Sequence, residues 1–200
     1  MACVSQGHVA VVTDSTSYLP TGVAQDLGIA VVPVQVIVDG TPYDETEDGQ
    51  ASRVAEALRQ WRVVTTSRPS PVRFLQAYRA AQDAGASGVV ALTLSSSMSA
   101  THESAVLAAA EVDLPIEVVD SRSIAMGLGF AAITAARIAA TGACLSQVAA
   151  AARDRAERTS VYFYVDTLEY LRRGGRIGAA RAAVGQVLKV KPLLQVVDGH

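Results

Sequence analysis

Hydroxyl side chains gather in one short stretch of this sequence: Ser95, Ser96, Ser97, Ser99 and Thr101. They follow an apolar run at residues 89–94 and precede alanine-rich sequence, a pattern typical of a buried strand, a loop and a helix. In open α/β sheets ligands bind beside the carboxyl ends of strands, and the next helix directs unpaired N–H groups to the same place. Such a position favours an anionic ligand.

A simpler explanation covers part of this stretch, because Ser and Thr are common at the start of a helix. Ser99 or Thr101 could be such a cap. One helix start needs only one hydroxyl, so we favour a ligand site over a cap alone.

Two further hydroxyl clusters accompany predicted strands. Thr13, Asp14, Ser15, Thr16 and Ser17 follow the apolar run at residues 9–12. Residues 65–71 read Thr-Thr-Ser-Arg-Pro-Ser-Pro, where the two prolines favour a stiff, extended segment.

Predicted strands and helices alternate along the chain, which predicts a mostly parallel sheet with helices on both faces. We expect one strand over residues 29–38 and an acidic, exposed, irregular segment over 43–49, with Asp44–Asp48 solvated. We expect helices at 50–61, from Pro71 to Gly85, and at 145–158. Residues 160–165 depart from the alternating pattern that precedes them, so we place a domain boundary near residue 158 and expect the start of a second α/β domain after it.

Gly127 and Gly129 lie inside another predicted helix, where each glycine costs roughly 1 kcal/mol relative to alanine. We expect them to allow close packing against a neighbour. No G-x-G-x-x-G pattern follows a strand, so we predict no cofactor.

Composition is ordinary for a globular protein, with 50% hydrophobic and 18% charged residues and a net charge of −2, which gives no reason to expect nucleic acid. The charge is uneven, because residues 1–150 carry 8 basic against 14 acidic residues and residues 151–200 carry 9 against 5. The second part contains a basic run without an intervening acid: Arg172, Arg173, Arg176, Arg181, Lys189 and Lys191. This run predicts a surface for a phosphate or an acidic partner.

Cys3 and Cys144 show no spacing typical of zinc sites or disulfide frameworks, which favours a reducing compartment. With three histidines we predict no metal site. The apolar run 124–133 is too short to span a bilayer, and we see no signal peptide. We therefore expect a cytoplasmic protein with at most transient membrane contact.

Seven motifs together resemble the DegV family of bacterial fatty-acid-binding proteins. In order they are Thr13-Asp14-Ser15-Thr16 with Leu19-Pro20, Val32-Pro33 with Asp39-Gly40 and Tyr43-Asp44, Thr66-Ser67-Arg68-Pro69-Ser70-Pro71, Leu94-Ser95-Ser96 with Ser99 and Thr101, Val119-Asp120-Ser121, Leu171-Arg172-Arg173-Gly174-Gly175-Arg176-Ile177, and Lys191-Pro192-Leu193-Leu194. Each motif alone is weak evidence for the family, whereas seven motifs in the order typical of the family are highly specific for it.

The resemblance implies two α/β domains, at residues 1–158 and 159–200, and a long-chain fatty acid in a buried apolar tunnel. It implies that hydroxyls hold the carboxylate, namely those of Thr66, Ser67, Ser95 and Ser96, with Asp14, Ser15 and Arg176 near the head group. It also implies a lipid-binding subunit rather than an enzyme. A separate dihydroxyacetone-kinase-type fatty acid kinase would make acyl phosphate for phospholipid synthesis.

The chain departs from the usual family pattern at Arg68, Ala100 and His102, where glutamine, glycine and an aromatic residue are common. The resemblance also implies a chain that continues past residue 200. Two other functions stay open: a binding module for a phosphorylated small molecule, and a serine hydrolase with His102 as its base, which is disfavoured because no G-x-S-x-G motif occurs.

Overall fold

A computed structural model describes residues 7–47, 49–177 and 193–200 of the chain. Its largest sheet has four parallel strands in the order β2-β1-β6-β7. In chain order these are β1 (His8–Asp14), β2 (Ile29–Val32), β6 (Ala86–Thr93) and β7 (Ile116–Asp120). The predicted α/β fold with a mostly parallel sheet is therefore confirmed.

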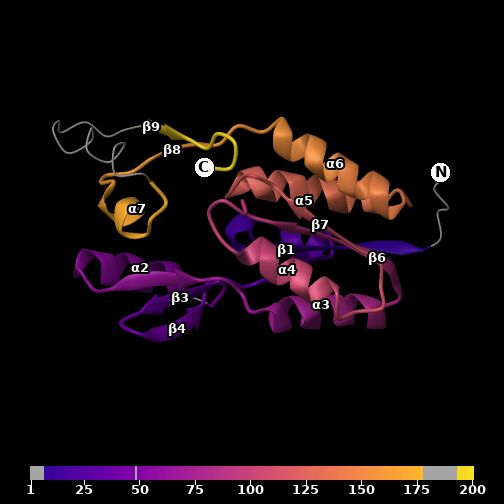
Figure 1. The fold of residues 1–200 in the computed structure, drawn as a ribbon, viewed down its shortest axis with the longest axis horizontal. Coiled ribbons are helices and arrows are strands. Elements are labelled where there is room, and N and C mark those ends of the chain that lie inside the picture. The colour runs from indigo at the N-terminus through magenta and orange to yellow at the C-terminus, as the bar shows by residue number, and fades with distance from the viewer. Residues whose placement is uncertain (1–6, 48, 178–192) are drawn as a thin grey trace.

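Helices cover both faces of this sheet (Figure 1). Successive side chains of a strand point to opposite faces, so β6 serves two cores. Val90 and Leu92 pack with the helix pair α5 and α6, and Val89 and Ala91 pack with the pair α3 and α4. The four helices are α3 (Pro71–Asp83), α4 (Thr101–Ala109), α5 (Met126–Ala139) and α6 (Leu145–Glu157), and a short α1 (Val23–Asp26) precedes β2.

The stretch 29–38, expected to be one strand, forms two strands in different sheets. Pro33 follows β2 and has no N–H for a strand ladder. The next N–H, that of Val34, donates to Ser15 Oγ instead of to a strand. The prediction of one strand is therefore wrong. The second sheet is antiparallel, in the order β4-β3-β5, with α2 (Gln50–Arg59) packed against it, and consists of β3 (Gln35–Val38), β4 (Thr41–Asp44) and β5 (Val64–Ser67).

The segment 43–49 is more ordered than its acidic composition predicts. Its first two residues complete β4. Glu45 is half-buried, and its carboxylate accepts hydrogen bonds from the hydroxyls of Ser15 and Tyr18. The prediction of an irregular, solvated segment is wrong here, because these hydroxyls replace water around the carboxylate.

The close packing predicted at the two glycines of α5 is confirmed. A Cβ atom at Gly129 would lie 2.5 Å from the carbonyl oxygen of Ser17, and one at Gly127 would collide with Ser123 Oγ. Only glycine therefore lets α5 approach the single 3₁₀ turn η1 (Ser15–Ser17), which directly follows β1.

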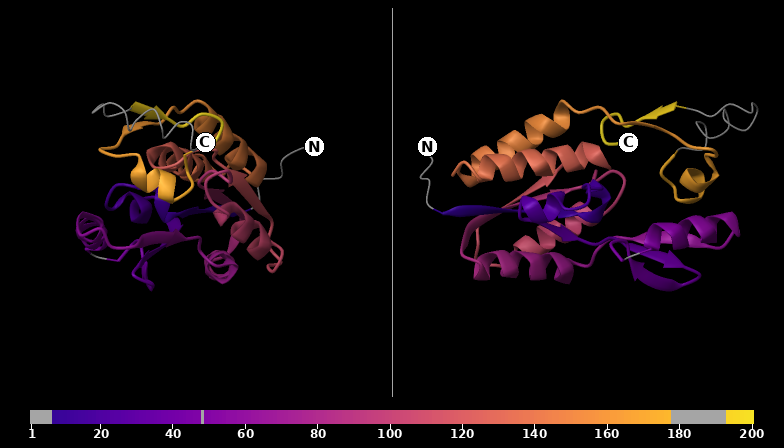
Figure 2. Two further views of the ribbon diagram at one scale, coloured as in Figure 1. Left: turned by 60° about the vertical axis from the view of Figure 1, so that its left-hand side comes forward. Right: turned by 180° about the vertical axis from the view of Figure 1, so that it is seen from behind.

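After α6 the chain crosses from the parallel sheet to the antiparallel one (Figure 2). There β8 (Tyr162–Tyr164) pairs antiparallel with β9 (Leu193–Gln195), and α7 (Glu169–Arg173) lies near α2, where Tyr170 donates to the Leu58 carbonyl at 3.3 Å. The turn predicted at Asp198-Gly199 is present. We call residues 161–177 and 193–200 the C-terminal segment. A domain boundary at residue 158 stays a prediction.

Some predictions fall outside the described residues. They concern Cys3, Lys191-Pro192 and the basic residues Arg181, Lys189 and Lys191. In the part of the chain that the structure describes, no helix is long and apolar enough to cross a membrane, and no group of three or more His, Cys, Asp or Glu side chains could hold a metal ion.

Candidate functional site: a cavity at the carboxyl edge of the parallel sheet

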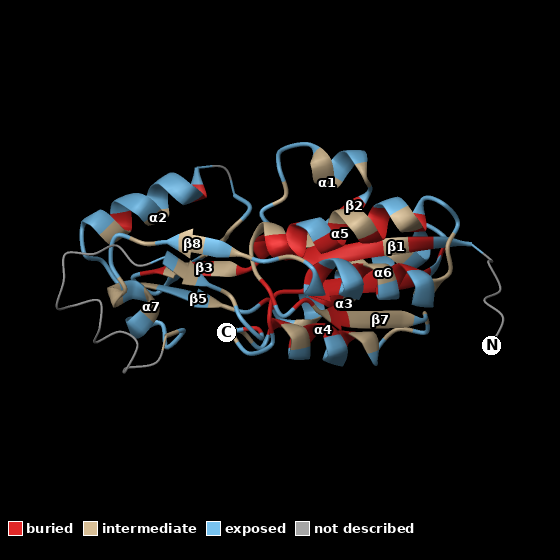
Figure 3. Cartoon of the chain, turned by 90° about the horizontal axis from the view of Figure 1, so that it is seen from above, coloured by how far each residue is buried: buried red, intermediate tan, exposed pale blue. Residues whose placement is uncertain are grey.

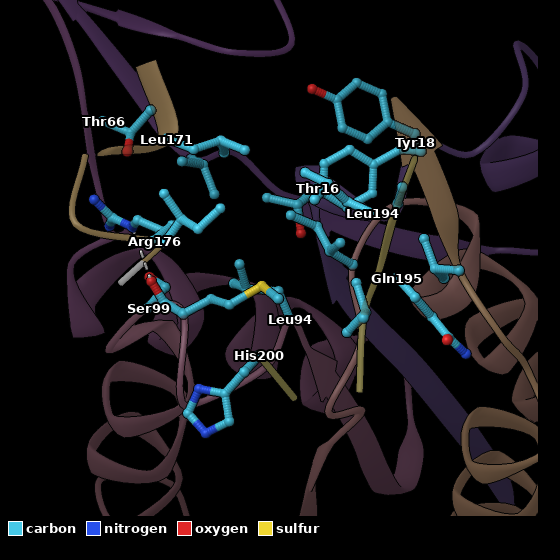
Figure 4. Close-up of a pocket in the computed structure, with 18 of the residues that line it drawn as sticks. Thr16, Tyr18, Thr66, Leu94, Ser99, Leu171, Arg176, Leu194, Gln195 and His200 are labelled. Atoms are coloured by element: carbon cyan, nitrogen blue, oxygen red, sulfur yellow. Dashed lines mark hydrogen bonds between the residues drawn. The ribbon is translucent and has the colours of Figure 1, made fainter. Parts of the chain in front are cut away.

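A cavity of about 920 Å³ lies at the carboxyl edge of the parallel sheet, bounded also by the antiparallel sheet and the C-terminal segment (Figure 4). This volume suits a small-molecule ligand, for which pockets of roughly 300–1,000 Å³ are usual. Apolar side chains from the edge of the parallel sheet and from the C-terminal segment form much of the wall, including Leu94, Met98, Ile124, Leu171, Ile177 and Leu194. The cavity therefore depends on segments that are far apart in the sequence.

Three polar side chains lie together on one side of the cavity. Thr66, Ser99 and Arg176 lie together there, whereas Tyr18 and Gln195 lie on the opposite side (Figure 4). The neighbours of Thr66 along the chain, Ser67 and Arg68, also line the cavity. We call Thr66, Ser67, Arg68, Ser99 and Arg176 the polar side. The Thr66 hydroxyl has no hydrogen-bond partner among the described residues, so it is available to a ligand.

The structure brings Thr66, Ser67 and Arg176 to the cavity but does not place Ser95 and Ser96 on its wall. Ser95 is fully buried and donates to the Gly199 carbonyl at 2.7 Å. Ser96 donates to the carboxylate of Asp120, which belongs to β7. The role of these two serines as carboxylate ligands stays a prediction.

Ser99 is the hydroxyl of this stretch that reaches the cavity, although the sequence placed it only in the hydroxyl cluster, or at a helix start, and not among the carboxylate ligands. It also accepts a hydrogen bond from the N–H of Thr101, at 3.3 Å, at the start of α4. The two interpretations are therefore compatible, because one serine oxygen serves the helix start and faces the cavity.

Asp14 lies buried at the end of β1, next to the cavity. Its Oδ1 accepts a hydrogen bond from the N–H of Thr16 at 3.0 Å, and its Oδ2 accepts one from the N–H of Leu94 at 2.8 Å. Both donors belong to residues of the cavity wall. Burial raises the pKa of Asp14 to about 6, since the hydrogen bonds offset only part of the desolvation and the nearby Glu45 opposes ionisation.

Ser15 connects the two sheets rather than facing the cavity. It accepts a hydrogen bond from Val34 and donates one to Glu45, whose other oxygen accepts from the Tyr18 hydroxyl at 2.9 Å. Burial and then the charge of Glu45 raise the pKa of Tyr18 to about 12. Tyr18 and Glu45 both line the cavity, and neither was predicted from the sequence, where the acidic composition around Glu45 suggested a solvated loop.

Two cavity residues have a strained backbone. Tyr18 (φ 46°) and Ala125 (φ 52°) both adopt positive φ without being glycine. Such a conformation costs of order 1–3 kcal/mol and persists only where the surroundings impose it. The Glu45 hydrogen bond to Tyr18 and the tight packing of α5 on η1 supply that constraint.

Two arginines from distant parts of the sequence hold the loop around Ser99. Arg176 Nε donates to the Met98 carbonyl at 3.2 Å, and Arg68 Nη1 donates to the Ala100 carbonyl at 3.2 Å. Because Ser99 lies between these two carbonyls, a guanidinium is anchored on each side of it.

The basic run of the C-terminal segment is largely neutralised in its described part. Arg172 and Arg173 both form ion pairs with Glu169, at 2.9 and 2.7 Å, and lower the pKa of Glu169. Arg176 has no acidic partner among the described residues, so its charge is directed to the loop and the cavity.

The departures from the family pattern are accommodated locally. Ala100 has φ −76°, so its side chain causes no strain where glycine is common. His102 lies in α4, and its Nδ1 is 3.1 Å from Thr93 Oγ1. Neither Ser95 nor Ser96 is hydrogen-bonded to this histidine, so the arrangement required for a serine nucleophile is not formed here.

Fold and cavity together define an α/β protein with a largely apolar internal cavity at the carboxyl edge of its parallel sheet. The chain belongs to the DegV family: a family model described as "uncharacterised protein, DegV family" matches residues 8–200, and the resemblance inferred from the motifs is confirmed.

Curated relatives carry the same family designation. A DegV domain-containing protein of Streptomyces coelicolor is 50% identical over 193 residues, covering 96% of this chain and 69% of the relative. One of Mycobacterium tuberculosis is 42% identical over 192 residues, covering 96% of this chain and 67% of the relative.

Solved structures described as fatty-acid-binding proteins have the same fold. The DegV family protein from Thermus thermophilus, described as binding fatty acid, is 37% identical with a TM-score of 0.87, covering 96% of this chain and 69% of that one. The fatty-acid-binding DegV from Bacillus subtilis is 30% identical with a TM-score of 0.84, covering 97% and 70%. A stearic-acid-binding protein from Eubacterium ventriosum is 26% identical with a TM-score of 0.81, covering 96% and 68%.

Proposed function

We propose that this chain binds a long-chain fatty acid in the cavity, with the acyl chain against the apolar wall and the carboxylate on the polar side. The observation that carries the proposal is the separation of the two kinds of lining within one cavity: Thr66, Ser99 and Arg176 on one side, apolar side chains over much of the rest. The fatty acids that the neighbouring structures are described as binding have the same two-part chemistry.

The two parts of the ligand contribute differently to binding. Burying about fifteen methylenes at ~0.8 kcal/mol each gives about 12 kcal/mol before the costs of association. A hydrogen bond to a charged group adds about 1.5–3 kcal/mol. The apolar wall therefore supplies the affinity, and the polar side orients the chain and selects for a carboxylate.

The head-group assignment keeps Thr66 and Ser67 as direct ligands, adds Ser99, and makes a direct ligand of Arg176, which the family resemblance placed only near the head group. Asp14 acts indirectly, since it positions two residues of the wall. Ser95 and Ser96 would contact the carboxylate only after leaving Gly199 and Asp120, their present partners.

Thr66 offers a matched test, because its neighbour Thr65 does not line the cavity. Thr66→Val removes the hydroxyl and keeps the shape, and because Thr66 is exposed we expect less than the full value of a charged hydrogen bond, a fall in palmitate affinity of about three- to tenfold. Thr65→Val should leave the affinity unchanged. Calorimetric titration of delipidated protein measures both, and equal affinities for the two variants would contradict the head-group assignment.

We further propose that the protein is a cytoplasmic, non-enzymatic subunit that presents the fatty acid to a separate kinase. Native mass spectrometry of the purified protein, followed by lipid extraction, should find one bound long-chain fatty acid. Adding a dihydroxyacetone-kinase-type kinase and ATP should then yield acyl phosphate. Bound lipid that no such kinase phosphorylates would support the binding function and refute the presenting one.

A further inference from the structure

Arg68 is a cavity residue whose guanidinium is only partly used by the protein. Its Nη1 donates to the Ala100 carbonyl at 3.2 Å and forms an ion pair with Glu103 at 2.5 Å. Its Nε and Nη2 have no partner among the described residues. An arginine carries five N–H donors in a planar fork, so Arg68 keeps donors for a further anion.

The position of Arg68 places these donors on the polar side of the cavity. Arg68 directly follows Ser67 along the chain, and its bond to Ala100 brings the guanidinium to the loop that presents Ser99. Arg176 reaches the same loop through Met98. Two guanidiniums therefore bind the backbone on either side of Ser99, a residue of the cavity wall.

Hydroxyls and guanidiniums select different head groups. A Ser or Thr hydroxyl can donate or accept, so it suits an alcohol as well as a carboxylate. A guanidinium only donates, matches the two oxygens of a carboxylate, and forms charge-assisted hydrogen bonds about twice as strong as neutral ones. A guanidinium therefore favours an ionised head group over a neutral one more strongly than a hydroxyl does.

We propose that Arg68 is a direct ligand of the bound carboxylate and, together with Arg176, a residue by which the cavity prefers an ionised fatty acid to a neutral lipid of the same length. The proposal rests on the fatty-acid function above and identifies a specificity-determining residue of that site. Glu103, in the first turn of α4, competes with the ligand for the charge of Arg68, whose position at the loop is kept by its hydrogen bond to the Ala100 carbonyl.

The experiment compares palmitate with 1-hexadecanol, which has the same chain length and no charge. Arg68→Gln removes the charge and keeps a polar side chain. We expect it to weaken palmitate about fivefold to tenfold, since Arg68 is partly exposed, and to change hexadecanol less than about twofold. The matched control is Arg79→Gln on α3, an exposed arginine that does not line the cavity, which should change neither ligand.

Glu103→Gln separates a ligand role from a purely structural one. If the ion pair only stabilises the loop, removing either partner weakens palmitate binding in the same direction. If Arg68 binds the carboxylate, Glu103→Gln removes a competing anion and tightens palmitate about twofold to threefold. This variant retains Arg68, so it decides the question even where Arg68→Gln folds poorly.

Each result has one meaning. A loss of palmitate selectivity in Arg68→Gln together with tighter binding in Glu103→Gln supports the proposal. Equal losses for palmitate and hexadecanol in Arg68→Gln, or weaker palmitate binding in Glu103→Gln, overturn it while the fatty-acid function stands. Wild-type protein that binds neither ligand refutes the function and, with it, the role of Arg68.

Discussion

The parallel sheet of this protein packs against more buried apolar residues than the antiparallel sheet does. The parallel sheet has a core on each face, and Leu92, Phe74 and Leu128 are completely buried there (Figure 3). The antiparallel sheet has one small core, in which the buried hydrophobic residues among those described are only Val36 and Val38 of β3 and Ala57 of α2. The cavity therefore lies at the edge of the well-packed parallel sheet with its helices, which we call the scaffold. The antiparallel sheet, which has the smaller core, closes another side of the cavity.

This difference suits a protein that must admit a ligand. Elements with few buried apolar contacts open locally at low free-energy cost, whereas a fully packed core opens only with the whole fold. The antiparallel sheet carries Thr66, Ser67 and Arg68 near the scaffold edge that carries Leu94 and Ser99. We therefore expect substitutions in the scaffold to change mainly the free energy of unfolding, and substitutions in the antiparallel sheet to change mainly the affinity for the ligand.

The largest expected effect tests that division directly. Leu92→Ala, at the centre of the parallel sheet, should lower the free energy of unfolding by about 3–5 kcal/mol through lost burial and a residual cavity. Val36→Ala in the antiparallel sheet should cost about 1 kcal/mol. Urea denaturation measures both, and similar losses in the two variants would break the comparison.

The second effect concerns Asp14, whose buried carboxyl holds the scaffold edge together. Its pKa is raised from 3.8 to about 6, so the folded protein retains this proton after the unfolded chain has lost it. The contribution to stability is complete below pH 3.8 and is lost as the pH rises to about 6, a decrease of about 3 kcal/mol. Asp14→Asn should remove this decrease.

The measurement for Asp14 is the difference in unfolding free energy between the wild type and Asp14→Asn from pH 3.5 to 7, because that difference cancels the titration of other carboxyls. The amide that replaces the carboxyl in this variant also accepts fewer hydrogen bonds, which lowers stability by an amount that does not depend on pH. A difference that stays flat across the window would show that folding does not raise the pKa of Asp14.

A smaller effect is expected at Ala125, where the strained backbone borders the cavity. Ala125→Gly removes the Cβ that makes φ 52° unfavourable, so we expect a gain of about 1 kcal/mol, reduced by the greater freedom of glycine in the unfolded chain. Thermal unfolding measures the gain. A clear loss of stability would mean that the alanine methyl group contributes more by packing than the backbone loses by strain.

The smallest expected effect concerns the hydrogen bond between Tyr18 and Glu45, which connects the two sheets. Tyr18 belongs to the scaffold edge, and Glu45 follows the antiparallel strand β4. A double-mutant cycle of Tyr18→Phe and Glu45→Gln should give a coupling of about 0.5–1 kcal/mol, since the pair is largely exposed. A coupling near zero would leave Ser15 as the link that holds Glu45 in place.

Local patterns in the sequence were sufficient for much of the scaffold. Strand periodicity and apolar runs predicted the parallel sheet, Pro71 marked the start of α3, and the glycines of α5 predicted its close packing. The seven motifs identified the family. These features depend on neighbours within a few residues or on side-chain alternation along one element, and the sequence displays both directly.

Only the tertiary structure decided which polar groups face the cavity. Ser95 and Ser99 lie in the same loop, yet Ser95 turns to Gly199, which is 104 residues away, and Ser99 lines the cavity. Glu45 looked solvated until Ser15 and Tyr18 supplied its hydrogen bonds. A hydroxyl or carboxylate takes whichever partner the fold brings to it, and partners so distant along the chain leave no local signal in the sequence.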